Sequence, residues 1–162
     1  VPTLGGKTDM IPGRTNITWL QADEPGVYRG QCAEYCGAQH SRMALRIVAQ
    51  PPEEFEAWRE RQLQPAEPVQ TAALKEGQRR FGRDCAVCHP IRGRRASGEL
   101  GPDLPHLTSR EQLAAGMLEN NIATLSGWIV NPQNLKPGTL MPSTELSGPE
   151  LVSLRNYLLT LD

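Results

Sequence analysis

The sequence predicts two small domains, an all-β domain followed by an all-α domain. Its first fifty residues carry β-branched and aromatic residues in short runs, whereas its second half carries apolar residues at helical spacing. Between them, Gln62 to Gln70 contains two prolines and no apolar periodicity, as a linker does. We therefore expect domains at residues 1–62 and 71–162, joined by a linker at residues 63–70. Only 38% of the residues are hydrophobic, so each core is small and a bound metal or cofactor is expected to support it.

The all-β domain is predicted from three strand-like segments, which turns rich in Gly, Pro and Asp separate. They cover residues 16–20, 26–30 and 43–48. A helix is then expected from Pro51, because prolines and acidic residues fill its first turn. Phe55 and Trp58 lie three residues apart on this helix, so we expect them to share its buried face.

The all-α domain is predicted from four helices. They are expected at residues 72–81, from Thr108, at residues 124–130 up to Asn131-Pro132, and from Ser147. Two of them begin at capping boxes, Thr108-x-x-Glu111 and Ser147-x-x-Glu150, in which both side chains bond backbone N–H groups of the first turn. The expected core residues of these two helices are Leu113 with Met117 or Leu118, and Leu151, Leu154, Leu158 and Leu161.

Cys85, Cys88 and His89 form a C-x-x-C-H motif, which is the attachment motif of haem c. Two thiols at this spacing can add across the two haem vinyl groups, and the next residue then lies under the iron as its proximal ligand. A thioredoxin-like C-x-x-C motif belongs to a βαβ unit, whereas this motif follows a predicted helix. A zinc site needs four ligands, and no further cysteine lies nearby. Haem attachment is therefore the strongest interpretation.

A haem that carries electrons needs a sixth ligand, usually Met or His. The candidates are His106, Met117 and Met141. Met117 is expected on an apolar helical face, and His106 is more typical of a surface or hydrogen-bonding histidine. Met141 lies in a stiff loop, Lys136 to Pro142, that is suited to present a side chain. Met141 is therefore the preferred ligand, and its thioether would raise the haem potential.

The predicted all-α domain resembles the class I c-type cytochromes. Gly77-x-x-x-Phe81 is similar to the first helix of that family, which crosses the last helix. Gly101-Pro102-x-Leu104 is similar to the family segment whose proline carbonyl accepts a hydrogen bond from Nδ1 of the haem histidine. The resemblance implies that Pro102 orients His89, and that Met141 is the axial methionine.

Cys32, Cys36, His40 and Met43 lie within twelve residues and offer two thiolates, an imidazole and a thioether. Soft copper prefers such a set of ligands. The two cysteines alone are also compatible with a disulfide in an oxidising compartment, or with a copper-chaperone C-x-x-x-C site. The added histidine and methionine argue against both alternatives. A loop with this spacing can wrap two coppers that the thiolates bridge.

Residues 1–62 resemble the dinuclear copper (CuA) domain of cytochrome c oxidase subunit II, which has a cupredoxin-like all-β fold. The matching segments are Val1 to Asp9, Ile11 to Arg14, Tyr28 to Gly37, and His40 with Met43. The resemblance implies that Cys32 and Cys36 bridge two coppers, with His40 and Met43 as terminal ligands. It also implies that the backbone carbonyl of Glu34 binds copper, while its carboxylate faces a magnesium or manganese site shared with subunit I. Nitrous oxide reductase has a similar loop with Trp in this position, so Glu34 favours the oxidase.

The same family carries a second histidine ligand and earlier cupredoxin strands before the segment that matches Val1. We therefore expect the copper domain to be truncated at its N-terminus and its copper site to be incomplete in this chain. Residues 1–162 alone are then expected not to give the mixed-valence electron paramagnetic resonance spectrum of CuA. Any membrane anchor is expected upstream, because no apolar run here approaches the roughly 20 residues that span a bilayer.

Charge argues against a nucleic-acid partner, because both halves are close to neutral. The chain has seven basic and eight acidic side chains up to Gln64, and ten basic and ten acidic side chains after it. The two resemblances together imply the electron-entry subunit of a caa-type haem–copper oxidase, on the periplasmic or extracytoplasmic face of a bacterial cell membrane. Electrons from cytochrome c or another donor would enter at the haem and pass to copper. They would then reach subunit I, where oxygen is reduced to water.

Two other hypotheses stay open at this point. One is a free-standing soluble electron carrier with no oxidase partner. Residues Leu4 to Asp9 and Glu34 argue against it, because they resemble surfaces that meet subunit I. The other is a copper chaperone or thiol-redox protein, which predicts reversible oxidation of Cys32 and Cys36 and no need for Met43.

Overall fold

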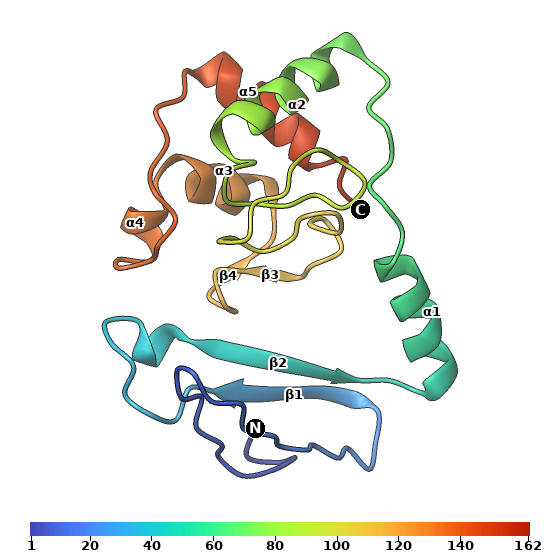
Figure 1. The fold of residues 1–162 in the computed structure, drawn as a ribbon, viewed down its shortest axis with the longest axis vertical. Coiled ribbons are helices and arrows are strands. Elements are labelled where there is room, and N and C mark those ends of the chain that lie inside the picture. The colour runs from blue at the N-terminus through green and yellow to red at the C-terminus, as the bar shows by residue number, and fades with distance from the viewer.

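The structure is a computed structural model that describes every residue from Val1 to Asp162. We call residues 1–62 the N-terminal part and residues 71–162 the C-terminal part. A two-stranded sheet with its loops forms one layer of the molecule and the helical C-terminal part forms the other, while helix α1 joins them along one edge (Figure 1). None of the helices combines the length and the apolar character that crossing a bilayer requires.

The sheet of the N-terminal part pairs β1 (Gly26–Gln31) with β2 (Ala44–Ala49) in antiparallel register, Gly26 opposite Ala49 and Gln31 opposite Ala44. These strands match two of the three predicted segments. The strand predicted at residues 16–20 is wrong, because no neighbouring strand pairs with it. Ile17 and Trp19 are 90% and 77% exposed, and a strand pattern is stable only against a packed surface.

Helix α1 (Pro52–Gln62) begins as predicted, with proline and two glutamates in its first turn. Its expected buried face is wrong. Phe55 and Trp58 contact each other, with ring centroids 5.7 Å apart, yet each is 44% exposed. The helix lies at the edge of the molecule, where no other element covers that face (Figure 1). With α1 and long loops beside its two strands, the N-terminal part is not all-β.

The segment at residues 63–70 has no helix or strand and is fastened to the C-terminal part. Arg92 donates to the carbonyl of Gln62, and Arg94 donates to the carbonyl of Glu67. Ala66 is buried in the core of the C-terminal part, and its N–H lies 3.3 Å from the carbonyl oxygen of Arg92. These bonds fix the connection between the two parts.

The C-terminal part contains four helices and one short hairpin. They are α2 (Ala72–Asp84), β3 (Gln112–Leu113), β4 (Leu118–Glu119), α3 (Ile122–Val130), α4 (Pro132–Leu135) and α5 (Gly148–Leu158). The predicted helices at residues 72–81, at residues 124–130 and from Ser147 are thus present. Leu154 and Leu158 of α5 are buried in the core as expected, whereas Leu151 is only partly buried and Leu161 is buried beyond the end of the helix.

The helix predicted from Thr108 is wrong, and the hairpin β3–β4 takes its place. The Thr108 hydroxyl and N–H both donate to the carbonyl of Leu161, at 3.2 and 2.9 Å, so this threonine caps no helix. The Glu111 carboxylate pairs with Arg46 of the N-terminal part instead of turning back to the backbone. Both side chains of the apparent capping box are thus engaged with distant partners.

Helices α2 and α5 cross at a glycine, and this crossing places the end of α2. A Cβ atom on Gly77 would lie 2.6 Å from Cβ of Tyr157 and would also meet the carbonyl of Ser153. Only glycine allows so close an approach. Phe81 then packs against Tyr157, with ring centroids 5.7 Å apart. The resemblance to the first and last helices of c-type cytochromes holds in this respect.

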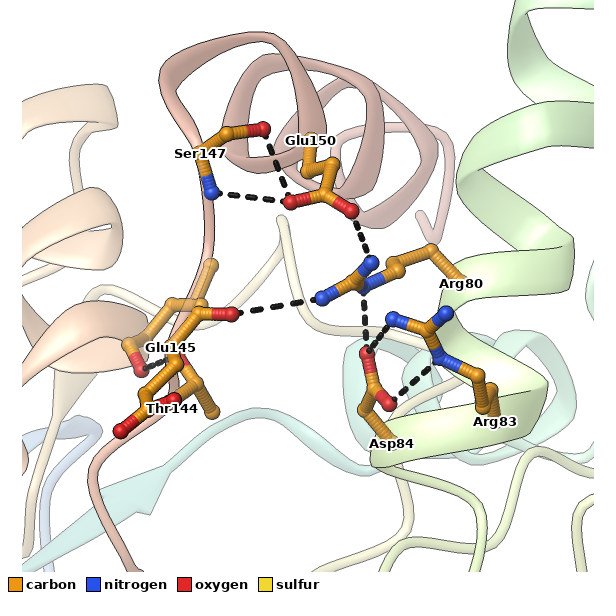
Figure 2. Close-up of polar contacts among 8 residues, drawn as sticks. Arg80, Arg83, Asp84, Thr144, Glu145, Ser147 and Glu150 are labelled. Atoms are coloured by element: carbon orange, nitrogen blue, oxygen red, sulfur yellow. Dashed lines mark hydrogen bonds and ion pairs between the residues drawn. The ribbon is translucent and has the colours of Figure 1, made fainter.

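A polar network also fastens α2 to the start of α5 (Figure 2). Arg80 forms ion pairs with Asp84 of its own helix and with Glu150 of α5, and its side chain is only 11% exposed. The Glu150 carboxylate also accepts from the N–H and the hydroxyl of Ser147, at 2.9 and 2.8 Å. Because Asp84 directly precedes Cys85, this network fixes the point where the C-x-x-C-H motif begins.

Candidate metal centres

The C-x-x-C-H motif forms a tight turn at the end of α2. The N–H groups of Cys88 and His89 both donate to the carbonyl of Cys85, at 3.0 and 2.9 Å. Burial raises the pKa of the Cys85 thiol to about 11, so its sulfur is uncharged at neutral pH. Such an apolar site suits a thioether, which carries no charge.

His89 is held in one orientation by the segment that follows the motif. Its Nδ1 lies 3.0 Å from the carbonyl oxygen of Pro102. A carbonyl can only accept, so Nδ1 carries the proton and Nε2 keeps a free lone pair for a metal. A Cβ atom on Gly101 would lie 2.5 Å from Cε1 of the same ring, so the backbone there must lack a side chain. The structure thus brings Pro102 to His89, as the resemblance implied.

The loop that carries Met141 is organised by Gln133 of α4, which sequence reasoning missed. Its side-chain amide donates to the carbonyls of Thr139 and Met141, at 2.6 and 3.1 Å, and its carbonyl accepts from the N–H of Gly138 at 3.1 Å. The only available signal was a glutamine three residues before a loop that contains Pro and Gly. Met141 itself is partly buried.

The two other candidates for a sixth ligand lie in unexpected places. His106 is not at the surface: it is 8% exposed, and its Nε2 has no hydrogen-bond partner. Met117 lies in the hairpin between β3 and β4 and not on a helical face, because the helix expected there is absent.

The second cluster of ligands lies in the loop between β1 and β2. The sulfur atoms of Cys32 and Cys36 are 3.5 Å apart, and Cys36 Sγ lies 3.8 Å from Nδ1 of His40. These three ligand atoms all lie within 4.8 Å of one another, and no disulfide joins the cysteines. The backbone carbonyl of Glu34 lies 3.2 Å from Cys32 Sγ and therefore faces the same point. Two soft sulfurs, an imidazole and a carbonyl oxygen together fit copper.

The β1–β2 sheet closes this loop at its base. The N–H of Cys32 donates to the carbonyl of Met43 at 2.9 Å, which continues the strand pairing by one step. A hydrogen bond with Cys32 raises the pKa of the Cys36 thiol. The Glu34 carboxylate pairs with Lys7, which also contacts Asp9 at 2.9 Å.

Comparison with known proteins matches both halves of the chain. Residues 1–50 match the family model described as the periplasmic domain of cytochrome c oxidase subunit II, and residues 74–162 match the cytochrome c model. Together the matches define a class of electron-transfer protein in which an oxidase copper domain and a c-type cytochrome share one chain.

Three relatives are each named cytochrome c oxidase subunit 2. The one from Alkalihalophilus pseudofirmus is 41% identical over 99% of this chain and 47% of its own length. Those from Bacillus sp. strain PS3 and Bacillus subtilis are 34% and 28% identical, over 99% and 98% of this chain and 48% of their own lengths. This chain belongs to the cytochrome c oxidase subunit II family, in the form that carries a cytochrome c domain. It spans about half the length of the curated relatives it matches. Membership implies haem in the C-terminal part and copper in the N-terminal part.

Proposed function

We propose that this chain is the electron-entry part of a haem–copper terminal oxidase. Electrons pass from haem c to a dinuclear copper centre and on to subunit I, which reduces oxygen to water. The chain relays electrons, and the oxygen chemistry takes place in the other subunit. The observation that carries the proposal is the presence of two preorganised ligand clusters in one chain, one around Cys32 and Cys36 and the other around His89.

The haem site uses four side chains in the C-terminal part. Cys85 and Cys88 would hold haem through thioether bonds, and His89 and Met141 would supply the two ligands of its iron. Support comes from the free Nε2 of His89, which the Pro102 carbonyl orients, and from the glutamine that fixes the Met141 loop. When bound, haem supplies a one-electron centre whose potential a thioether ligand raises.

The copper site uses the loop between β1 and β2. Cys32, Cys36, His40, Met43 and the backbone carbonyl of Glu34 would hold the two coppers, which would supply a one-electron centre. The 3.5 Å separation of the two sulfurs and the nearby imidazole support this assignment. Two thiolates in one rigid loop would spread the charge of the transferred electron, so the site would change its structure little when it gains or loses an electron.

The contacts with partners follow from the exposed side of the copper loop. The Glu34 carboxylate is 68% exposed and is tied to Lys7 of the segment Leu4 to Asp9. We assign this surface to the face that meets subunit I, where the carboxylate would bind a magnesium or manganese ion.

Cytochrome c or another donor delivers electrons to the haem. The complex lies at the periplasmic or extracytoplasmic face of a bacterial cell membrane.

A visible spectrum with a pyridine haemochrome assay, combined with copper analysis of the oxidase that carries this chain, tests the proposal. We expect one covalently bound haem c for each copy of this chain, lost when both Cys85 and Cys88 are replaced by alanine. We also expect the oxidase to contain copper. A Cys36→Ser variant should lose this copper and keep its haem. Non-covalent haem, or copper that is independent of Cys36, would overturn the assignment.

A further inference from the structure

The two ligand loops contact each other directly, at a place that no sequence motif indicates. The side-chain amide of Gln39 donates to the backbone carbonyl of Pro137. Beside this bond, a Cβ atom on Gly138 would lie 3.5 Å from Cβ of Ala38, which is an ordinary van der Waals distance, so the two loops lie side by side here. Gln39 directly precedes the copper ligand His40, and Pro137 belongs to the loop that carries Met141.

A second contact reaches the other end of the copper loop. The N–H of Ala44 donates to the carbonyl of Ala115 at 3.2 Å. Ala44 directly follows Met43, and Ala115 lies in the turn between β3 and β4. Figure 1 shows the β3–β4 hairpin above the start of β2. The first contact thus lies directly before His40, and the second lies directly after Met43.

Lys136 joins these two contacts. Its side chain is 7% exposed, and its Nζ donates to the carbonyl of Ala114 at 2.8 Å. No carboxylate pairs with this ammonium group, and burial lowers its pKa. Ala114 and Ala115 have φ angles of 55° and 59°, in the left-handed region that residues other than glycine seldom adopt. The bond from Lys136 therefore holds a turn that is unfavourable without it.

We propose that the segment Lys136–Gly138 is the docking point of the haem part on the copper loop, and that Lys136 and Gln39 are positioning residues for electron transfer between the two centres. The inference rests on the proposed function. With haem and copper bound, the transfer would move one electron from ferrous haem iron, leaving it ferric, to the oxidised copper pair. No bond or proton is exchanged. Electron tunnelling weakens steeply with distance, so residues that keep the two ligand loops in contact control its rate.

A third contact provides a test that leaves both ligand loops untouched. Arg46 of β2 forms an ion pair with Glu111 across the same interface. Their side chains are 28% and 69% exposed, so charge reversal at these positions is compatible with folding. The pair orients the two parts without touching a metal ligand.

The experiment measures the rate of electron transfer from haem c to copper after photoreduction of the haem in the holo-oxidase. Gln39→Leu and Lys136→Met should each slow the transfer at least about tenfold, the order of loss that small misplacements of reacting groups cause. The haem absorption spectrum and the copper resonance should stay unchanged in both variants. Gln70→Leu and Lys75→Met are the matched controls, because Gln70 also donates to a proline carbonyl, at 3.3 Å, and Lys75 is exposed on α2. Both controls should keep the rate of the unaltered oxidase.

Charge reversal and amide exchange give two further readings. Glu111→Arg should slow the transfer, and the double variant Arg46→Glu with Glu111→Arg should recover it. The Ala44 amide should exchange with deuterium faster in Lys136→Met, while the amides within the β1–β2 ladder beyond Ala44 stay protected. An unchanged rate in Gln39→Leu and Lys136→Met, with native spectra, would overturn the docking inference. Absence of any haem-to-copper transfer in the unaltered oxidase would instead overturn the proposed function.

Discussion

The Nδ1 atom of His89 lies 3.0 Å from the carbonyl oxygen of Pro102, which fixes the ring and leaves Nε2 free for a metal. The close approach of Gly101 makes this arrangement sensitive to a single methyl group. In a Gly101→Ala variant the new Cβ would lie 2.5 Å from Cε1 of His89 and push the ring aside. We expect part of the ferric haem to become high-spin in the absorption spectrum, with a loss of stability of about 1–3 kcal/mol.

Gly82→Ala is the matched control for that variant. Gly82 lies in α2, and a Cβ atom there meets no atom within 4 Å. Alanine should therefore leave the haem spectrum unchanged and raise the free energy of unfolding by up to about 1 kcal/mol through helix propensity. Equal spectra in both variants would argue against iron ligation by His89.

The Met141 loop gives a second prediction. Replacing Gln133 by Leu removes the hydrogen bonds to Gly138, Thr139 and Met141, so the loop loosens and the thioether leaves the iron for part of the time. The near-infrared charge-transfer band of methionine-ligated ferric haem should weaken in Gln133→Leu and vanish in Met141→Leu. Met117→Leu should keep the band at full strength. A band that survives Met141→Leu would assign the sixth ligand to another residue.

The copper loop gives a third prediction, tested in the oxidase that carries this chain. Met43→Leu removes a terminal ligand but keeps both bridging sulfurs, so copper should stay bound with an altered electron paramagnetic resonance spectrum. Cys36→Ser removes one bridge, and copper should be lost. A copper chaperone or thiol-redox protein would behave differently. For it, Met43→Leu would leave the metal unchanged, and Cys32 and Cys36 would form a disulfide reversibly.

Glu150 gives a prediction about pH. Hydrogen bonds from the N–H and hydroxyl of Ser147, with the charge of Arg80, hold the pKa of this carboxyl below its ordinary value of 4.5. A carboxyl with a lowered pKa stabilises the folded state above pH 4.5, and this contribution disappears as pH falls through its folded pKa. Glu150→Gln should therefore lower the melting temperature at pH 7, and the difference from the unaltered chain should shrink in acid. A difference that stays constant between pH 7 and pH 3 would contradict the role of this charge.

Sequence reasoning succeeded where the determining contacts are local. The helix after Ser147 follows from its capping box, and the ligand clusters follow from spacings of a few residues within one loop. It failed where distant partners decide. Thr108 bonds to Leu161 and Glu111 pairs with Arg46, so a pattern typical of a helix forms a hairpin. The bond from Gln39 to Pro137 links residues 98 positions apart, and no local pattern predicts it.

The central claim is that electrons pass from the haem held by His89 to copper held by Cys32 and Cys36. The most direct test follows haem c and copper together after photoreduction of haem c in the holo-oxidase. We expect haem reoxidation to be matched, electron for electron, by reduction of copper and of the centres of subunit I that copper supplies, and we expect this phase to disappear in Cys36→Ser. Haem reoxidation that leaves both copper and subunit I oxidised, or that proceeds unchanged in Cys36→Ser, would contradict the claim.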